Sequence, residues 1–161
     1  MEKDQSIKKS MIKNEDIMKE IAIENQEDLD KFLEIIDWHD SFIREIYCVS
    51  PGYIVEDPDL GTVAADALPG VKLLICTPYP ETPGVEFFFE EVDAINVPFS
   101  FDLEPVGKID NWGVKLYLDG KGGHYSISAQ KLTCKILDKS CWGWDVNYGL
   151  ESYFDESGFK L

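Results

Sequence analysis

Apolar residues recur at helical spacing shortly after the N-terminal segment. From residue 26 onward they follow the i, i+3, i+4, i+7 order of an amphipathic helix: Leu29, Phe32, Leu33 and Ile36. Asn25 precedes this run as a candidate N-cap, and Glu27 and Asp28 supply the acids that suit a first turn. These residues predict a helix whose apolar stripe needs a sheet to cover.

A shorter helix is predicted to start after Asn14, with Ile17, Met18 and Ile21 on its apolar face. Its end is ambiguous, because the run IAIE, which contains Ile21, could instead open a strand. Residues 1–12 are polar, and we expect them to be loose.

Most of the remaining chain has the apolar patterning of β-strands. Residues 51–70 are rich in proline, glycine and acids, so this stretch is predicted to be mostly loop with one edge strand at 53–55. Pro98 restricts the strand that contains it to a sheet edge or a bulge. The other predicted strands are 42–49, 71–76, 85–92, 94–101, 113–118, 124–130 and 131–137.

The last three predicted strands alternate apolar and polar residues. The apolar set expected to face inward is Val114, Leu116, Leu118, Tyr125, Ile127, Ala129, Leu132, Cys134 and Ile136. Asp119-Gly120 is a hairpin signal between the first two of these strands, so an antiparallel meander with one wet face is expected. The expected fold is α+β: a mainly antiparallel sheet of about six to eight strands, with one or two N-terminal helices packed on one face. One domain is expected over residues 1–161.

Charge is distributed unevenly along the chain, whose formal net charge is −16. Residues 51–107 hold eleven acids and one base, Lys72, whereas residues 108–139 hold three acids and six lysines. Arg44 is the only arginine. Nucleic-acid binding depends on basic patches and on arginine in particular, so a nucleic-acid partner is not expected.

An acidic surface can serve solubility alone, or it can attract a partner with a basic surface. On the second interpretation the acids of residues 51–107 form the contact region. The candidate partner-binding acids are Glu56, Asp57 and Asp59.

The compartment expected is the cytoplasm. The charged N-terminus does not resemble a signal peptide, and the chain has no apolar run long enough to span a membrane, so no membrane partner is expected. Cys48, Cys76 and Cys134 lie in apolar, strand-like runs, so buried free thiols are favoured over disulfides. Cys141 is the fourth cysteine.

The run His39-Asp40-Ser41 is the first candidate for chemistry. Adjacent residues cannot form a catalytic relay, and no GxSxG elbow is present, so a corner between helix and strand is favoured. There Trp38 would pack, and Asp40 or Ser41 would bond a backbone group. A hydrolase around His39 and Asp40 stays as an alternative.

Metal and cofactor sites lack their signatures. His39 and His124 are the only histidines, EDPDLG at 56–61 does not match a calcium loop, and DGKGG at 119–123 lacks the residues of a P-loop. No metal or cofactor is therefore expected, and the chain is expected not to be an enzyme.

Trp142 and Trp144 belong to an aromatic cluster near the C-terminus. Exposed tryptophans anchor protein interfaces and stack on sugars, but buried ones complete cores. These two residues are therefore candidates for partner binding, or for a small-ligand or carbohydrate site.

The order of apolar segments from Trp38 onward resembles a known kind of protein. WHDSFIREI leads into a strand, followed by VKLLI, the FEEVDAI step and the late run YSISAQKLTCKI. This order, over about residues 38–137, resembles small β-rich families predicted to be immunity proteins of bacterial polymorphic toxin systems. The resemblance implies an intracellular, non-enzymatic protein that neutralises a toxin by occluding its active site. Many such toxins are basic nucleases, which suits an acidic binder.

Overall fold

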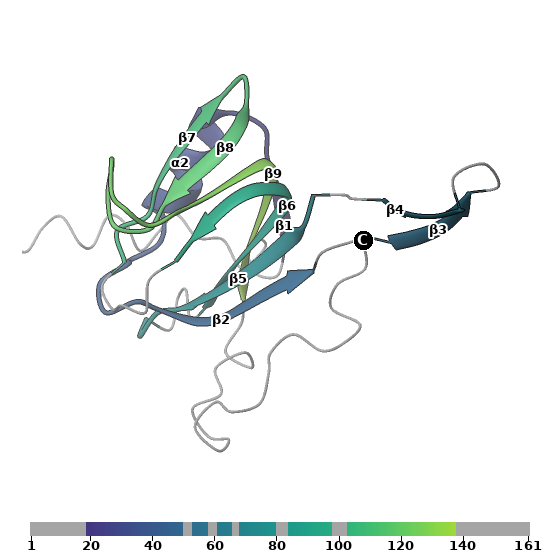
Figure 1. Cartoon of the computed structure of the whole chain (residues 1–161). Helices are drawn as coiled ribbons and strands as arrows, with labels where there is room; N and C mark the ends of the chain where they lie inside the picture. Colours follow the sequence, from purple (N-terminus) through teal and green to yellow (C-terminus); the bar gives the residue numbers. More distant parts are fainter. Residues whose placement is uncertain are drawn as a thin grey trace, which may run out of the picture.

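The computed structural model describes residues 19–49, 53–57, 61–65, 68–79, 84–97 and 103–137. Within these ranges the chain forms one helix and nine strands, and the strands are arranged in two separate sheets (Figure 1). The helix is α2 (Gln26–Glu34). The strands are β1 (Glu20–Ile23), β2 (Phe42–Val49), β3 (Tyr53–Asp57), β4 (Gly61–Ala65), β5 (Gly70–Cys76), β6 (Gly84–Asn96), β7 (Val106–Asp110), β8 (Gly113–Tyr117) and β9 (Ser126–Leu137).

The larger sheet has seven strands, all paired antiparallel, in the order β2-β5-β6-β9-β8-β7 with β1 added beside β9. Strand β9 runs along the whole of β6, from the pair Gly84–Leu137 to the pair Asn96–Ser126. Its other edge is shared by β8 and β1. The long pair β6–β9 therefore joins all the other strands of this sheet.

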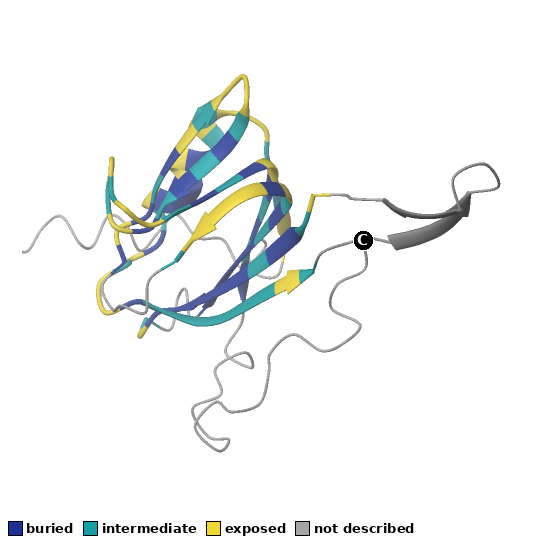
Figure 2. Cartoon of the chain, in the orientation of Figure 1, coloured by how far each residue is buried: buried dark blue, intermediate teal, exposed yellow. Residues whose placement is uncertain are grey.

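One face of this sheet packs against α2. Phe87 on β6 is fully buried, and its ring lies 6.0 Å from Phe32 and 6.1 Å from Phe89 between ring centroids. Figure 2 shows buried residues gathered where the helix meets the strands. Burial of this apolar area is the main driving force for the fold. The opposite face carries a small second cluster in which Leu74 and Leu137 are fully buried and Tyr47 packs against them.

Helix α2 begins where the sequence predicts. The Asn25 side-chain oxygen accepts a hydrogen bond from the backbone N–H of Asp28 at 3.0 Å, which is the geometry of an N-cap. Leu29, Phe32 and Leu33 are the buried residues of the helix, so the predicted apolar stripe is confirmed.

The helix is also fastened to the edge of β7. The Gln26 side-chain amide donates to the Gly107 carbonyl oxygen at 2.9 Å and accepts from the Ile109 N–H at 2.8 Å. Gln26 thus satisfies two backbone groups of an edge strand, as a neighbouring strand would. The approach is close enough that a Cβ at position 107 would overlap the Leu29 side chain, so this position requires glycine.

Several predicted strands are confirmed, including 42–49 and 71–76. The predicted strands 124–130 and 131–137 are instead one strand, β9, and the boundary predicted between 85–92 and 94–101 falls inside β6. The predicted three-strand meander is therefore wrong in its last two strands, whereas the hairpin predicted around Asp119-Gly120 is present as the antiparallel pair β8–β9. Residues 98–101 lie outside the described ranges.

Two further predictions are corrected. Tyr125 was expected to face inward, but it is 37% exposed and lies just before β9 begins. Ile21 lies in β1, so the alternative that IAIE opens a strand is confirmed at this residue, while residues 1–18 lie outside the description. The predicted edge strand at 53–55 is β3, but residues 61–65, predicted to be loop, form β4, and β7 was not predicted either.

Candidate functional site

The hairpin β3–β4 carries two of the predicted partner-binding acids. Its register runs from the pair Tyr53–Ala65 to the pair Asp57–Gly61, which places Glu56 and Asp57 at its turn end. Figure 1 shows this hairpin standing clear of the seven-stranded sheet, with the turn end farthest away. Asp59 belongs to residues 58–60, outside the described ranges.

Trp142 and Trp144 also fall outside the described ranges, as does Cys141. Their predicted roles in partner or sugar binding therefore stay predictions. A different tryptophan, Trp112, is 84% exposed at the turn between β7 and β8, where its carbonyl oxygen accepts a hydrogen bond from Gln130 at 2.9 Å.

The acids of residues 51–107 are distributed over several elements. Glu86 is buried on β6, and its carboxylate lies 3.7 Å from the Lys72 ammonium, which is the single base of this region. Glu91 and Asp93 are exposed near the bulge of β6, and Glu104 is exposed on another segment. Lys72 pairs with Glu86 inside the sheet. Residues 51–107 therefore contain no other base that could neutralise their exposed acids.

The run His39-Asp40-Ser41 forms the predicted corner between α2 and β2. The Ser41 N–H donates to the Trp38 carbonyl oxygen at 3.1 Å, and the fully buried Ser41 hydroxyl accepts from the Leu103 N–H at 3.3 Å. Trp38 stacks on Phe87, with 6.2 Å between ring centroids. The predicted structural role of Trp38 and Ser41 is confirmed.

An open hollow of about 400 Å³ lies beside this corner, lined by Trp38, His39, Leu103, Glu104, Pro105 and Val106. Asp40 does not line it, although its carboxylate lies 3.7 Å from the His39 imidazole. Both of these side chains are mostly exposed, at 71% for His39 and 65% for Asp40. Ser41 is fully buried with its hydroxyl against the Leu103 backbone, so this hydroxyl is not open to a substrate beside His39.

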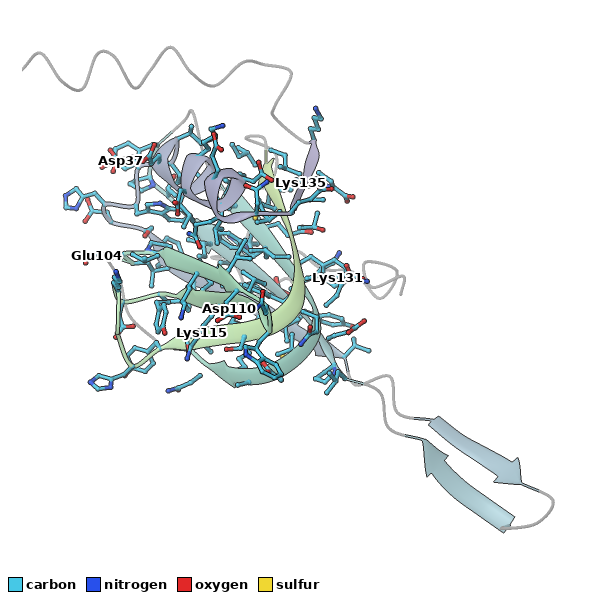
Figure 3. The ribbon with its side chains drawn as sticks, turned by 90° about the horizontal axis from the view of Figure 1, so that it is seen from above. Asp37, Glu104, Asp110, Lys115, Lys131 and Lys135 are labelled. Atoms are coloured by element: carbon cyan, nitrogen blue, oxygen red, sulfur yellow. The ribbon has the colours of Figure 1, made fainter. Side chains whose placement is uncertain are left out.

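Glu104 was not identified from the sequence. It lines the same hollow as Trp38 because residues 103–106 lie beside the corner, and no local motif marks this arrangement. Figure 3 places Glu104 and Asp37 toward the same side of the molecule in its view. A juxtaposition of residues more than sixty positions apart depends on the sheet topology, and the sequence pattern carries no signal for it.

The lysines of residues 108–139 also separate in space. Lys108 and Lys115 are direct cross-strand partners on β7 and β8, and the Lys115 ammonium lies 5.0 Å from the centroid of the Tyr117 ring. Lys131 and Lys135 instead lie opposite Glu90 and Glu86 along the β6–β9 pair. Two of the six lysines of this segment therefore lie opposite acids of another strand, and two others lie opposite each other.

The cysteines and metal-ligating residues give no further site among the described ranges. Cys76 and Cys134 are buried free thiols, as predicted, and burial raises the pKa of Cys134 well above its usual value. Cys48 is exposed, which corrects the prediction for that residue. The described residues include no group of three or more His, Cys, Asp or Glu that could hold a metal ion.

No helix within the described part of the chain is both long and apolar enough to cross a membrane. Comparison with models of protein families, with curated proteins and with solved structures finds no match for this chain.

Proposed function

We propose that this chain is a non-enzymatic protein-binding protein that neutralises a toxin, as an immunity protein does, by docking an acidic surface on a basic partner. The observation that supports this proposal is the β3–β4 hairpin. A two-stranded hairpin is marginally stable at best in water unless another layer packs against it. This one stands clear of the seven-stranded sheet, with Glu56 and Asp57 at its far end.

Charge adds a second line of support. Acids concentrated on a projecting element speed the encounter with a basic surface and make association sensitive to salt. In the complex the partner supplies the packing layer that the hairpin lacks among the described residues. A function of this kind requires no catalytic residue and no cofactor in the chain.

The first experiment is a pull-down from the native host at low salt, with the tagged full chain as bait, a salt step for elution and mass spectrometry for identification. A basic protein released by salt would support the proposal, and repeated recovery of no partner would count against it.

The contact region is then tested with the recovered partner. Glu56→Gln combined with Asp57→Asn should lower the association rate several-fold at low salt and flatten its dependence on salt. The matched control is Glu24→Gln combined with Glu34→Gln, which removes the same charge from exposed positions at the two ends of α2. An equal effect of both pairs would contradict a contact through the hairpin.

A further inference from the structure

The hollow beside the α2–β2 corner has the composition of a socket for one long side chain. Leu103, Pro105 and Val106 are apolar lining residues, Trp38 is an aromatic one, and the polar lining residues are the exposed Glu104 and His39. Its volume of about 400 Å³ is near the lower end for ligand pockets in proteins. A single side chain or a small group suits this volume better than a folded segment does.

The walls of the hollow are fixed before any ligand arrives. The Ser41 hydroxyl ties the corner to Leu103, and the Trp38 indole N–H donates to the Leu33 carbonyl oxygen at 2.9 Å. The backbone of Glu104 is held on both sides, because its N–H donates to the Leu118 carbonyl oxygen at 2.9 Å and its own carbonyl oxygen accepts from the Gly120 N–H at 3.0 Å. A preorganised site loses less entropy when it binds.

Within the described part of the chain, no cation engages the Glu104 carboxylate. Glu104 is exposed, and none of the ion pairs found among the described residues includes it. An acid, an aromatic residue and apolar residues around one hollow match the three parts of an arginine side chain. The guanidinium pairs with the carboxylate and stacks on the ring, and the aliphatic stem covers apolar surface.

We propose that this hollow receives an arginine side chain of the basic protein partner. The inference rests on the proposed function and adds a second contact point, separate from the β3–β4 hairpin. Arginine is favoured over lysine because its planar fork can stack on Trp38 while it donates to Glu104, whereas a lysine ammonium is a compact point charge. Arginine is also enriched among the residues that dominate binding energy at interfaces.

The test uses arginine amide as the probe and the full chain labelled with ¹⁵N. Titration should shift the indole N–H signal of Trp38 and the backbone signals of Glu104 and Val106, with a dissociation constant in roughly the millimolar range. Citrulline amide has the same shape without the charge, and it should bind at least about threefold more weakly. Equal binding of the two probes, or no shift at these signals, would overturn the proposal.

Glu104→Gln should weaken the binding of arginine amide about threefold to fivefold, the range of an exposed ion pair, while the rest of the spectrum stays unchanged. Asp93→Asn is the matched control, since it removes one exposed acid that does not line the hollow, and it should leave the affinity unchanged. Equal weakening by both variants would indicate general charge attraction and would contradict a defined socket.

The two proposals fail separately. Binding of arginine amide at the hollow is measured without any partner. If no partner is recovered, the proposed function is contradicted, but the result of the arginine amide titration still holds. Conversely, a partner that binds the wild type and Glu104→Gln with the same dissociation constant would overturn the socket as a contact point while the hairpin contact stands.

Discussion

The seven-stranded sheet and the β3–β4 hairpin share antiparallel pairing and differ in what lies against them. In the sheet, Phe87 and its neighbours are covered by α2, and the edge at β7 is closed by the Gln26 amide. The hairpin is a separate two-stranded sheet that stands clear of these layers (Figure 1). Its cross-strand pairs join Val55 to Val63 and Glu56 to Thr62.

Under the proposed function, the sheet provides the stability of the molecule and the hairpin provides a binding contact. Ordering a residue in a strand costs about 1–2 kcal/mol of backbone entropy, which the sheet offsets by burying apolar area under the helix. The hairpin has no such layer within the described residues, so we expect it to contribute little to folding. Under the proposed function, such a segment can adapt its shape to the partner.

The largest expected effect comes from the centre of the sheet. Phe87→Ala removes a fully buried ring that contacts Phe32, Trp38 and Phe89, and should lower the free energy of unfolding by about 3–5 kcal/mol. Urea denaturation followed by circular dichroism measures this change. A loss below about 1 kcal/mol would contradict the packing of α2 on this face.

A smaller loss is expected where the helix closes the edge of β7. Gln26→Leu removes both hydrogen bonds to the strand and should cost about 1–3 kcal/mol in the same assay. Gln130→Leu is the control, because the Gln130 side chain makes one exposed bond to the Trp112 carbonyl oxygen. If the control loses as much stability as Gln26→Leu, the edge contact has no special role.

A pH-dependent effect is expected in the loop between β8 and β9. Desolvation raises the pKa of the Asp119 carboxyl, but the backbone N–H groups of His124 and Tyr125, at 2.9 and 3.0 Å, outweigh it and hold the pKa below its usual value. A lowered pKa means that the carboxylate stabilises the fold above about pH 4, and that this contribution is lost as the pH falls through the folded-state pKa. The wild type should therefore lose more stability between about pH 5 and pH 3 than Asp119→Asn does. Parallel pH profiles in thermal denaturation would contradict this role.

The smallest effect on stability is expected from the hairpin. Replacement of residues 53–65 by a short Gly-Ser linker should change the free energy of unfolding by no more than about 0.5 kcal/mol, while association with the basic partner slows. Denaturation and binding kinetics on the same variant measure both quantities. A loss of several kcal/mol would show that the hairpin is part of the folding unit, and would remove the contrast with the sheet.

Local patterns predicted the elements whose signals are complete within a few residues. Asn25 with the apolar spacing after it located α2, β-rich apolar runs located β2 and β5, and alternation located β8. The division of β6 and β9 into two strands each was wrong because breaks in alternation resemble turns. In the structure the break in β6 is a bulge between Val92 and Ala94 inside one continuous pair, next to Glu91 at a φ of 55°.

The residues of the candidate site also fall into those identified from local sequence and those identified only from the structure. The sequence identified Glu56 and Asp57 from local charge and His39-Asp40-Ser41 from local composition, and Ser41 keeps the structural role predicted for it. It could not identify Glu104 as a residue that lines the same hollow as Trp38, because this arrangement depends on how residues 103–106 return beside the corner.

The sequence by itself determined the class of the fold, the helix start at Asn25 and the acidity of residues 51–107, because periodicity, capping and charge are local properties. Only the tertiary structure decided that β6 and β9 form one long central pair, that Gln26 bonds the edge of β7, and that Trp38 and Glu104 line one hollow. These features join residues distant in the chain, and long-range pairing is set by the packing of the whole sheet.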